Sequence, residues 1–320
     1  MRLEYMVTAA FVLDLILGDP RWFPHPVKLI GRFAAMLENP LRSCIRNTRA
    51  AGVMAVIIVL AVTGGITFGL ISSARLISPL TGDIVSILLL YMTFAAHDLA
   101  RHSHNVYTAL REGDLPEARR RVSLMVGRDT ANLSEGEVTR GAVESVAENL
   151  VDGVTAPIFF AVIGGPVCAM LYKAVNTLDS TFGYKDERYI LFGWASARLD
   201  DAANYIPARL TAPLISLAAA LLGLRPVNAF RMFLRDGRKH PSPNSGLSEA
   251  AVAGALGIQL GGTNYYSGEP SDGQLMGDPI IPIDRRSIIR ANALMLVTAV
   301  IAVMLFTAVR ITIGQILIFT

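Results

Sequence analysis

The chain has 320 residues, of which 52% are hydrophobic and 17% charged, and its mean hydropathy is +0.45. Ordinary soluble domains carry about 25% charged residues, so this composition predicts a membrane protein. The formal net charge is only +3, and no basic tract is interleaved with aromatic residues, which argues against a nucleic-acid partner. Cys44 and Cys168 lie far apart without a CxxC pattern, so neither a disulfide framework nor a structural zinc site is indicated.

Three apolar stretches are expected to cross the membrane, because a spanning helix needs about 20 apolar residues. Residues 51–73 and 291–309 reach this length without a charge. Residues 84–96 are shorter, but we expect their helix to continue through His97 and Asp98 and to span as well.

Other apolar stretches are less regular. Residues 3–17 follow no basic leader and end in no small-residue cleavage site, so they are expected to be a retained membrane segment that contains Asp14. Residues 154–172 are interrupted by Gly-Gly-Pro at 164–166, and residues 206–224 carry two prolines and an arginine. Such interruptions are typical of broken or re-entrant membrane segments.

The distribution of arginine predicts how the loops are oriented. Arginines cluster between the apolar segments 3–17 and 51–73, in the residues that follow the segment 84–96, and in residues 225–290. By the positive-inside rule we expect a multi-pass protein of the cell (inner) membrane, with these loops in the cytoplasm and the N-terminus outside. The two broken segments then either both cross or both fail to cross, and we favour the second because it keeps every polar motif on one side.

The predicted fold is all-α, a polytopic integral membrane protein with broken or re-entrant helices and cytoplasmic helical loops. One domain is expected over residues 1–320, with a cytoplasmic helical hairpin at about 97–128. No internal repeat and no alternating strand pattern is found. The polar segments expected to carry the functional site are 13–31, 128–160, 173–209 and 234–262.

The segment 128–160 combines a helix start with a row of acids. Ser134 and Glu137 form the Ser-x-x-Glu pattern of a capping box, so a helix is expected to begin near Ser134. At about 100° per residue, four acids then fall on one face of this helix. They are Glu137, Glu144, Glu148 and Asp152.

This acidic row cannot face lipid, since each charge would cost on the order of 3 kcal/mol at mid-bilayer. Carboxylates on one helical face suit Mg²⁺, which takes oxygen ligands and bridges to substrate phosphates. A solvated face whose acids pair with Arg128 and Arg140 is the plainer alternative.

A basic loop in the segment 234–262 is the best candidate for a phosphate site. Its arginines and lysine precede a proline-rich turn, and a helix with free backbone amides then begins near Ser245, a natural place for an anion. No GxxxxGK[ST] motif is present. The cations assigned to phosphate are Arg235, Arg238 and Lys239 in this loop, with Arg128 before the acidic helix.

Two other polar clusters could take part in chemistry. His25 lies among three prolines in residues 13–31, where a rigid interfacial loop is the alternative. Lys173, Asn176 and Asp179 share a helix face that could hold a phosphate and its metal, and an ordinary interfacial helix end is equally consistent with them.

Five motifs together resemble the cobinamide-phosphate synthase family of cobalamin biosynthesis, called CbiB or CobD. In chain order they are LDLILGDPRWFPHPVKLIG, GRDTANLSEGEVTRGAVESVAENLVDGVTAPIFF, YKAVNTLDSTFGYK, ARLDDAANYIPARLTA and RDGRKHPSPNSGLSEAAVAGALGIQLGG. The resemblance implies a multi-pass membrane enzyme, a carbon–nitrogen ligase that joins adenosylcobyric acid, a corrinoid, to an amino-alcohol phosphate such as aminopropanol phosphate. The product would be adenosylcobinamide phosphate, and the family is described as using ATP and Mg²⁺.

The implied amide bond fits the polar clusters. A carboxylate must be activated before an amine attacks it, and an acyl phosphate is the expected intermediate. Mg²⁺ on the acidic row would bridge nucleotide phosphates, and Lys173 would neutralise the transferring group. The basic loop would hold the amino-alcohol phosphate, and His25 or Asp179 would take the amine proton.

The expected partners are these small molecules and membrane lipid. The small residues that follow Ser245 would also permit a homo-oligomer, and other membrane proteins of the cobalamin pathway are an open alternative. Two other functions compete. An intramembrane Mg²⁺-dependent prenyl-type transferase would need aspartate-rich pairs that are not both present, and a membrane transporter would be expected to show inverted halves, which are not visible.

Overall fold

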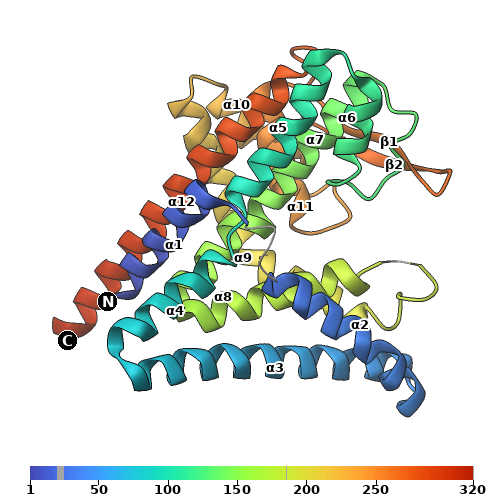
Figure 1. Ribbon diagram of the computed structural model, residues 1–320. Coiled ribbons are helices and arrows are strands. Elements are labelled where there is room, and N and C mark those ends of the chain that lie inside the picture. The colour runs from blue at the N-terminus through green and yellow to red at the C-terminus, as the bar shows by residue number, and fades with distance from the viewer. Residues whose placement is uncertain (20–24, 185, 320) are drawn as a thin grey trace. The chain divides into compact units, whose positions relative to one another are not determined.

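The computed structural model describes residues 1–19, 25–184 and 186–319. It is helical apart from one two-stranded sheet (Figure 1), which confirms the predicted fold class. The elements are α1 Leu3–Leu17, α2 Pro26–Cys44, α3 Thr48–Ile77, α4 Pro79–Tyr91, α5 Ala96–Glu112, α6 Leu115–Val122, α7 Glu135–Leu150, the π-helical turn η1 Val151–Thr155, α8 Ala156–Phe182, α9 Trp194–Leu221, α10 Pro226–Asp236, α11 Ser245–Leu256, β1 Leu260–Tyr266, β2 Glu269–Met276 and α12 Arg286–Phe319.

The chain packs into two compact units, each built from separate stretches. Unit 1 contains residues 1–95, 156–204 and 303–320, and unit 2 contains residues 96–155 and 205–302. The helices α9 and α12 each contribute to both units. The expectation of a single domain over 1–320 stays a prediction.

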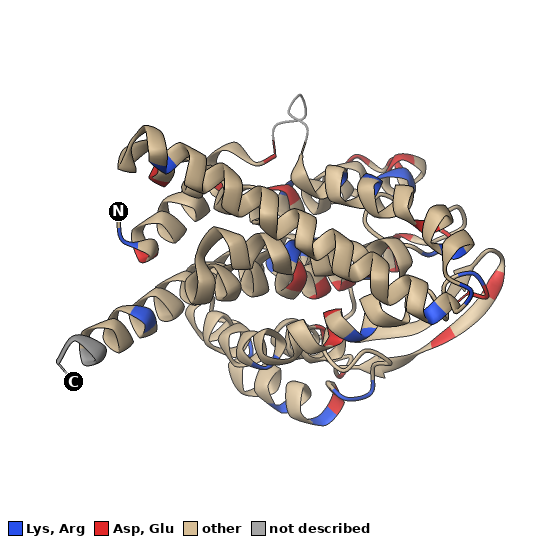
Figure 2. Cartoon of the chain, turned by 90° about the horizontal axis from the view of Figure 1, so that it is seen from below, with Lys and Arg blue, Asp and Glu red and all other residues tan. Residues whose placement is uncertain are grey.

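Four helical stretches in the described part of the chain are long and apolar enough to cross a membrane. They are Thr48–Ile77, Pro79–Glu112, Glu135–Phe182 and Arg286–Gln315. The predicted spans 51–73 and 291–309 lie inside the first and the last of these stretches. In Figure 2 the helix that leads to the C-terminus is largely free of charged residues, as a lipid-facing helix requires. Whether the broken segments cross fully stays a prediction.

The prediction of one continuous helix through His97 and Asp98 is wrong. Helix α4 ends at Tyr91 and α5 begins at Ala96. Between them the Thr93 hydroxyl donates to the Leu90 carbonyl at 2.6 Å, and the Thr93 amide donates to the same carbonyl. A threonine side chain that bonds nearby backbone competes with the helical pattern, and the chain turns here.

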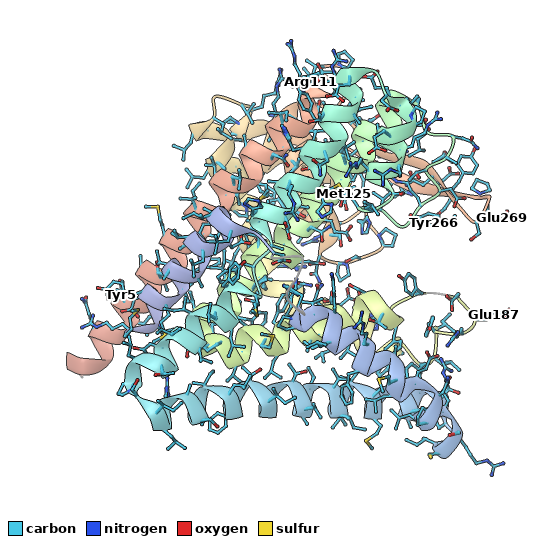
Figure 3. The ribbon with its side chains drawn as sticks, in the orientation of Figure 1. Tyr5, Arg111, Met125, Glu187, Tyr266 and Glu269 are labelled. Carbon is cyan, nitrogen blue, oxygen red and sulfur yellow. The ribbon has the colours of Figure 1, made fainter. Side chains whose placement is uncertain are left out.

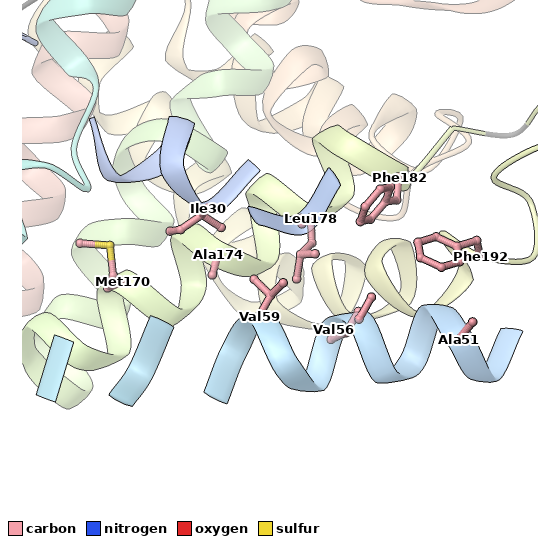
Figure 4. Close-up of a cluster of buried hydrophobic side chains, with 11 residues drawn as sticks. Ile30, Ala51, Val56, Val59, Met170, Ala174, Leu178, Phe182 and Phe192 are labelled. Atoms are coloured by element: carbon pink, nitrogen blue, oxygen red, sulfur yellow. The ribbon is translucent and has the colours of Figure 1, made fainter. Parts of the chain in front are cut away.

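Helix α3 is the support against which much of unit 1 packs. Its residues Val56 and Val59 face Leu178 of α8 and Ile30 of α2 in one buried apolar cluster (Figure 4). Small residues allow the backbones to approach closely, as is usual between membrane helices. A Cβ added at Gly52 would lie only 1.9 Å from the carbonyl oxygen of Phe192.

The sequence-predicted break in residues 154–172 is confirmed. Gly164 and Gly165 have non-helical backbone angles, and Gly165 has a φ of +67° that only glycine adopts easily. The break removes helical donors from the carbonyls before it. Arg310 of α12 supplies one instead, because its Nη1 donates to the Val162 carbonyl at 2.6 Å.

In unit 2, α5 and α6 form a helical hairpin where one is predicted at about 97–128, and its place in the cytoplasm stays a prediction. Gly113 reverses the chain with a φ of +79°, and the Asp114 carboxylate caps α6 by accepting from the Glu117 amide at 2.9 Å. Both helices pack on α7.

The sequence shows no alternating strand pattern, but the structure contains one pair of strands. β1 and β2 form an antiparallel hairpin that turns at Ser267 and Gly268, with a register shift between Leu260 and Gly262. Figure 3 shows Tyr266 and Glu269 at its outer end. The strands escaped recognition because nearly every residue of β2 is exposed, so no apolar alternation marks them.

Replacing Gly52 by alanine tests the packing of α3. The new methyl group would meet the Phe192 carbonyl, and such overpacking costs about 1–3 kcal/mol. We expect a lower unfolding temperature in detergent. Gly65→Ala is the matched control on the same helix, since no atom lies within 4 Å of its added Cβ, and equal unfolding temperatures for both variants would contradict the packing.

Candidate functional site: a polar pocket in unit 2

The start of α7 is fixed by the capping box that the sequence predicts. Ser134 is the N-cap, and the Glu137 carboxylate accepts from the Ser134 amide at 2.8 Å and from its hydroxyl at 2.7 Å. The predicted helix start is therefore confirmed. The capping box also engages Glu137 in hydrogen bonds at the helix start, about two turns before Glu144, the next acid of the row.

Glu144 joins α7 to the loop before it and to the β-hairpin. Its carboxylate forms an ion pair with Arg128, which is 8% exposed, and accepts from the Gly261 amide at 2.8 Å. Arg140 completes this clamp by donating to the Gly261 carbonyl and, at 2.9 Å, to the side-chain oxygen of Asn264. Arg128, predicted to bind phosphate, thus neutralises a half-buried carboxylate and holds the hairpin start.

A cavity of about 300 Å³ lies beside this clamp. The loop before α7, α7 itself, the turn before α11, α11 and the hairpin all contribute walls, and Figure 3 labels two of the lining residues, Met125 and Tyr266. Its size is at the lower end of the range for small-molecule sites. The ionisable side chains in the lining, apart from the tyrosine, are Arg128, Glu144, Glu148, His240, Glu249 and Asp272.

Glu249 is the most unusual of these groups, and the sequence analysis missed it. It is 6% exposed, and its side chain has no hydrogen bond to any residue that the structure describes. Burial raises the pKa of Glu249 well above its ordinary value, and the charges of Glu148 and Glu144 add to this while Arg128 opposes it. The available signal was a single acid within a helix of otherwise small and apolar residues.

Glu148 is the exposed acid of the row, and it accepts a hydrogen bond from the Ser245 hydroxyl at 3.2 Å. This contact places the predicted phosphate-binding residue Ser245, the first residue of α11, beside the acidic helix. Asp152 lies in the π-helical turn η1, is half-buried and has a partner.

The four acids predicted to bind metal do not form a preassembled metal site. In the part of the chain that the structure describes, no group of three or more His, Cys, Asp or Glu side chains could hold an ion. Any Mg²⁺ would draw most of its ligands from a bound phosphate and water, as this ion commonly does. The metal role of Glu137, Glu144, Glu148 and Asp152 stays a prediction.

Two of the predicted phosphate-binding cations in the basic loop surround a buried acid. Asp236 is fully buried and pairs with Arg235 at 2.6 Å and with Lys239 at 2.7 Å. It also accepts from the Gly277 amide at 2.9 Å. The hydrogen bond from Arg235, with those from Lys239 and Gly277, holds the pKa of Asp236 well below its ordinary value, although burial acts in the opposite direction. Arg238 is exposed, with no ion pair to a described residue.

The three predicted catalytic residues belong to unit 1. His25 caps α2, since its Nδ1 accepts from the Val27 amide at 3.3 Å, and its Nε2 lies 3.4 Å from Asp19. Lys173 and Asp179 lie half-buried on α8. Residues 20–24 of the segment 13–31, and residue 185 of the segment 173–209, lie outside the described residues.

Next to Lys173 a polar network links α8 to α9. The Tyr172 hydroxyl donates to the Asn204 side chain at 2.8 Å, and Asn204 donates to Asp200 at 3.0 Å. The Asn176 amide reaches the other Asp200 oxygen at 3.4 Å. Asp200 is only 9% exposed, so these amides replace the water that its carboxylate would otherwise need. The sequence pointed to Asn176 but not to Tyr172 or Asn204.

The apolar helices of the chain and the polar pocket of unit 2 define a polytopic helical membrane protein with a small-molecule-sized site. Comparison with known proteins gives the family. The model of the CobD/Cbib protein family matches residues 7–295, and the chain belongs to that family.

Several relatives cover nearly the whole chain. A cobalamin biosynthesis protein CobD of Geobacter metallireducens is 56% identical over 87% of this chain and 88% of its own length. CobD of Leptospira interrogans is 46% identical over 92% and 94%, and CbiB of Salmonella paratyphi B is 47% identical over 94% and 95%. No solved structure matches the chain significantly. The chain is thus a cobalamin biosynthesis protein of the CobD/CbiB type.

Arg128→Ala tests the clamp on the hairpin. Removing one partner of a buried ion pair leaves the other charge uncompensated and costs about 3–5 kcal/mol. We expect faster amide hydrogen exchange in residues 260–276. Arg111→Ala is the control, because Arg111 is exposed and pairs only loosely, at 3.7 Å, with Glu112. Unchanged exchange in the hairpin of Arg128→Ala would show that the clamp does not hold it.

Asp236→Asn tests the buried acid. It is expected to destabilise the protein at neutral pH by about 1–3 kcal/mol, the usual cost of leaving buried hydrogen bonds unmade. Because the folded-state pKa of Asp236 is depressed, its contribution is complete above the unfolded pKa of about 3.9 and is lost as the pH falls through the folded value. The difference in unfolding temperature between wild type and variant should therefore persist to about pH 4 and shrink below it. A constant difference at all pH values would exclude this ionisation.

Proposed function

We propose that this protein is an amide-forming ligase that joins adenosylcobyric acid to an amino-alcohol phosphate and gives adenosylcobinamide phosphate. The observation that carries the proposal is membership of the CobD/CbiB family over residues 7–295. The polar pocket of unit 2 adds support, because its lining offers acidic side chains that no lysine or arginine of the lining neutralises, apart from Glu144, to a small charged substrate.

The chemistry requires an activated carboxyl group. ATP is proposed as the co-substrate that converts the corrinoid carboxylate to an acyl phosphate, and the amine of the second substrate then displaces the phosphate. Mg²⁺, bound with the nucleotide, would neutralise phosphate charge as it does in other phosphoryl transfers. The predicted roles of Lys173 toward the transferring group and of His25 or Asp179 toward the amine proton remain proposals.

Residues of unit 2 would bind the small substrate. Lys239 lies at the pocket edge, since its Nζ is 3.4 Å from the carbonyl of Leu275, which sits between the lining residues Gln274 and Met276. Arg238 on the same loop is exposed to solvent. Arg238 is suited to a phosphate that enters from water, and its attraction adds to that of the nearby α11 N-terminus, whereas Lys239 already pairs with Asp236.

A product assay tests the proposal. Purified protein in detergent is incubated with adenosylcobyric acid, 1-amino-2-propanol phosphate, ATP and Mg²⁺, and the corrinoid is analysed by mass spectrometry. We expect the mass of the amide product, and none when ATP or the amine is omitted. Parallel incubations with ethanolamine phosphate and threonine phosphate identify the preferred amino alcohol. Absence of an amide product from every amine would refute the ligase activity.

A further inference from the structure

Glu249 has an environment that folding alone does not explain. Its side chain is buried, lines the pocket and accepts no hydrogen bond from a described residue. Burying a polar group without a hydrogen bond usually costs a few kcal/mol. A glutamate in this position is expected to serve a ligand that enters the pocket.

The acids around the pocket have too few countercharges. Arg128 neutralises Glu144, and Glu148 accepts only a hydroxyl hydrogen bond, from Ser245, among the described residues. In the same part of the chain no lysine or arginine lies within ion-pair distance of Glu148 or Glu249. The nearest basic group to Glu249 is His240, whose Nε2 is 4.0 Å from its Oε1.

A protonated amine fits this arrangement better than a metal ion does. An ammonium group presents three N–H donors and can be held by two carboxylates. A metal bound by the protein alone would need more converging ligands, and no such group exists among the described residues. Lys239, which also pairs with Asp236, borders the same pocket through Leu275, and the exposed Arg238 lies on the same loop. The ligand that matches both features is a small zwitterion with an ammonium group and an anionic group.

We propose that Glu249 and Glu148 bind the ammonium group of the amino-alcohol phosphate, and that Glu249 is the base that accepts its proton. The proposal rests on the proposed ligase function. Glu249 takes one N–H proton from the ammonium, and the freed nitrogen lone pair forms the C–N bond to the acyl carbon. The C–O bond to phosphate then breaks, and the second proton leaves with the departing phosphate.

The surroundings of Glu249 strengthen its attraction for a proton. The groups that face Glu249 are Glu148 and Glu144 on α7, Arg128 in the loop before it, and His240 in the turn before α11. Burial and the two acids raise the pKa of Glu249 above that of an ordinary glutamate. A carboxylate with a raised proton affinity is a stronger base than an exposed one.

Binding tests the ammonium site without turnover. Calorimetry compares 1-amino-2-propanol phosphate with 1,2-propanediol 2-phosphate, in which a hydroxyl replaces the amine, on the full-length protein in detergent. Wild type should bind the amine compound more tightly by about tenfold or more, the range expected for hydrogen bonds to charged groups. Glu249→Gln should remove most of this preference, and Glu135→Gln, an exposed acid on α7, should keep it. Equal binding of the two compounds to wild type would overturn the proposal.

Turnover tests the proton transfer. Glu249→Gln should slow amide formation from the amino-alcohol phosphate by about 10²–10⁴-fold, as loss of a general base does. Hydroxylamine is already neutral at pH 7, so hydroxamate formation by the same variant should fall far less. Equal loss of both reactions would indicate a merely structural role and overturn the proposal.

The two proposals fail in different ways. If wild type forms no amide with any amine, the ligase function is wrong, and the calorimetric comparison still decides whether an ammonium group binds. If wild type forms the amide and Glu249→Gln matches it in rate and pH profile, the role of Glu249 is wrong. If His25→Gln or Asp179→Asn shows the selective loss instead, the base is one of those residues and not Glu249.

Discussion

The ion pair between Arg128 and Glu144 is the interaction on which unit 2 depends. A half-buried carboxylate must be neutralised, and Glu144 meets this requirement by joining three segments that are far apart in sequence: the loop before α7, α7 itself and the first residues of β1. Arg140 reinforces the same junction from α7. These three segments line the pocket together with α11 and the turn before it, so the way in which one charge is compensated helps to set the shape of the pocket.

The need to neutralise a buried carboxylate also explains why the sequence predicts more free cations than the structure leaves for a ligand. A run of cations followed by a helix start predicts a phosphate site, but Arg235 and Lys239 both contact Asp236, which lies between them in sequence and is buried. Pairing of this kind depends on which side chain is buried, and burial is a tertiary property. A basic loop in a sequence therefore gives an upper limit to the cations that remain for a ligand.

Local chemistry was readable from the sequence, and contacts between distant segments were not. The apolar spans, the Ser134 capping box and the break at Gly164 and Gly165 follow from periodicity and backbone preference within a few residues, and the structure agrees. The turn at Thr93 was missed because residues 84–104 contain no glycine or proline that would mark a helix end. The hairpin was missed because its strands are held by charged side chains of another element and not by an apolar face.

The sequence alone could not single out Glu249 either, because its environment also depends on contacts with distant segments. Its helix is rich in alanine and glycine, which predicts close packing. The raised pKa of the acid within it depends in part on the carboxylates of the neighbouring α7. The long apolar helices are therefore the part of the molecule that the sequence alone predicts. The candidate site lies where segments of unit 2 meet, and its burial and electrostatics depend on contacts between those segments.

The break in α8 has a consequence for the biogenesis of the protein. The carbonyl group that it leaves without a helical donor is satisfied by Arg310, which follows Val162 by 148 residues. A ribosome that synthesises this chain delivers α8 to the membrane long before it delivers the last helix. Until then the nascent α8 must keep that carbonyl hydrated or borrow another donor, so the arrival of α12 completes the insertion of a helix made much earlier.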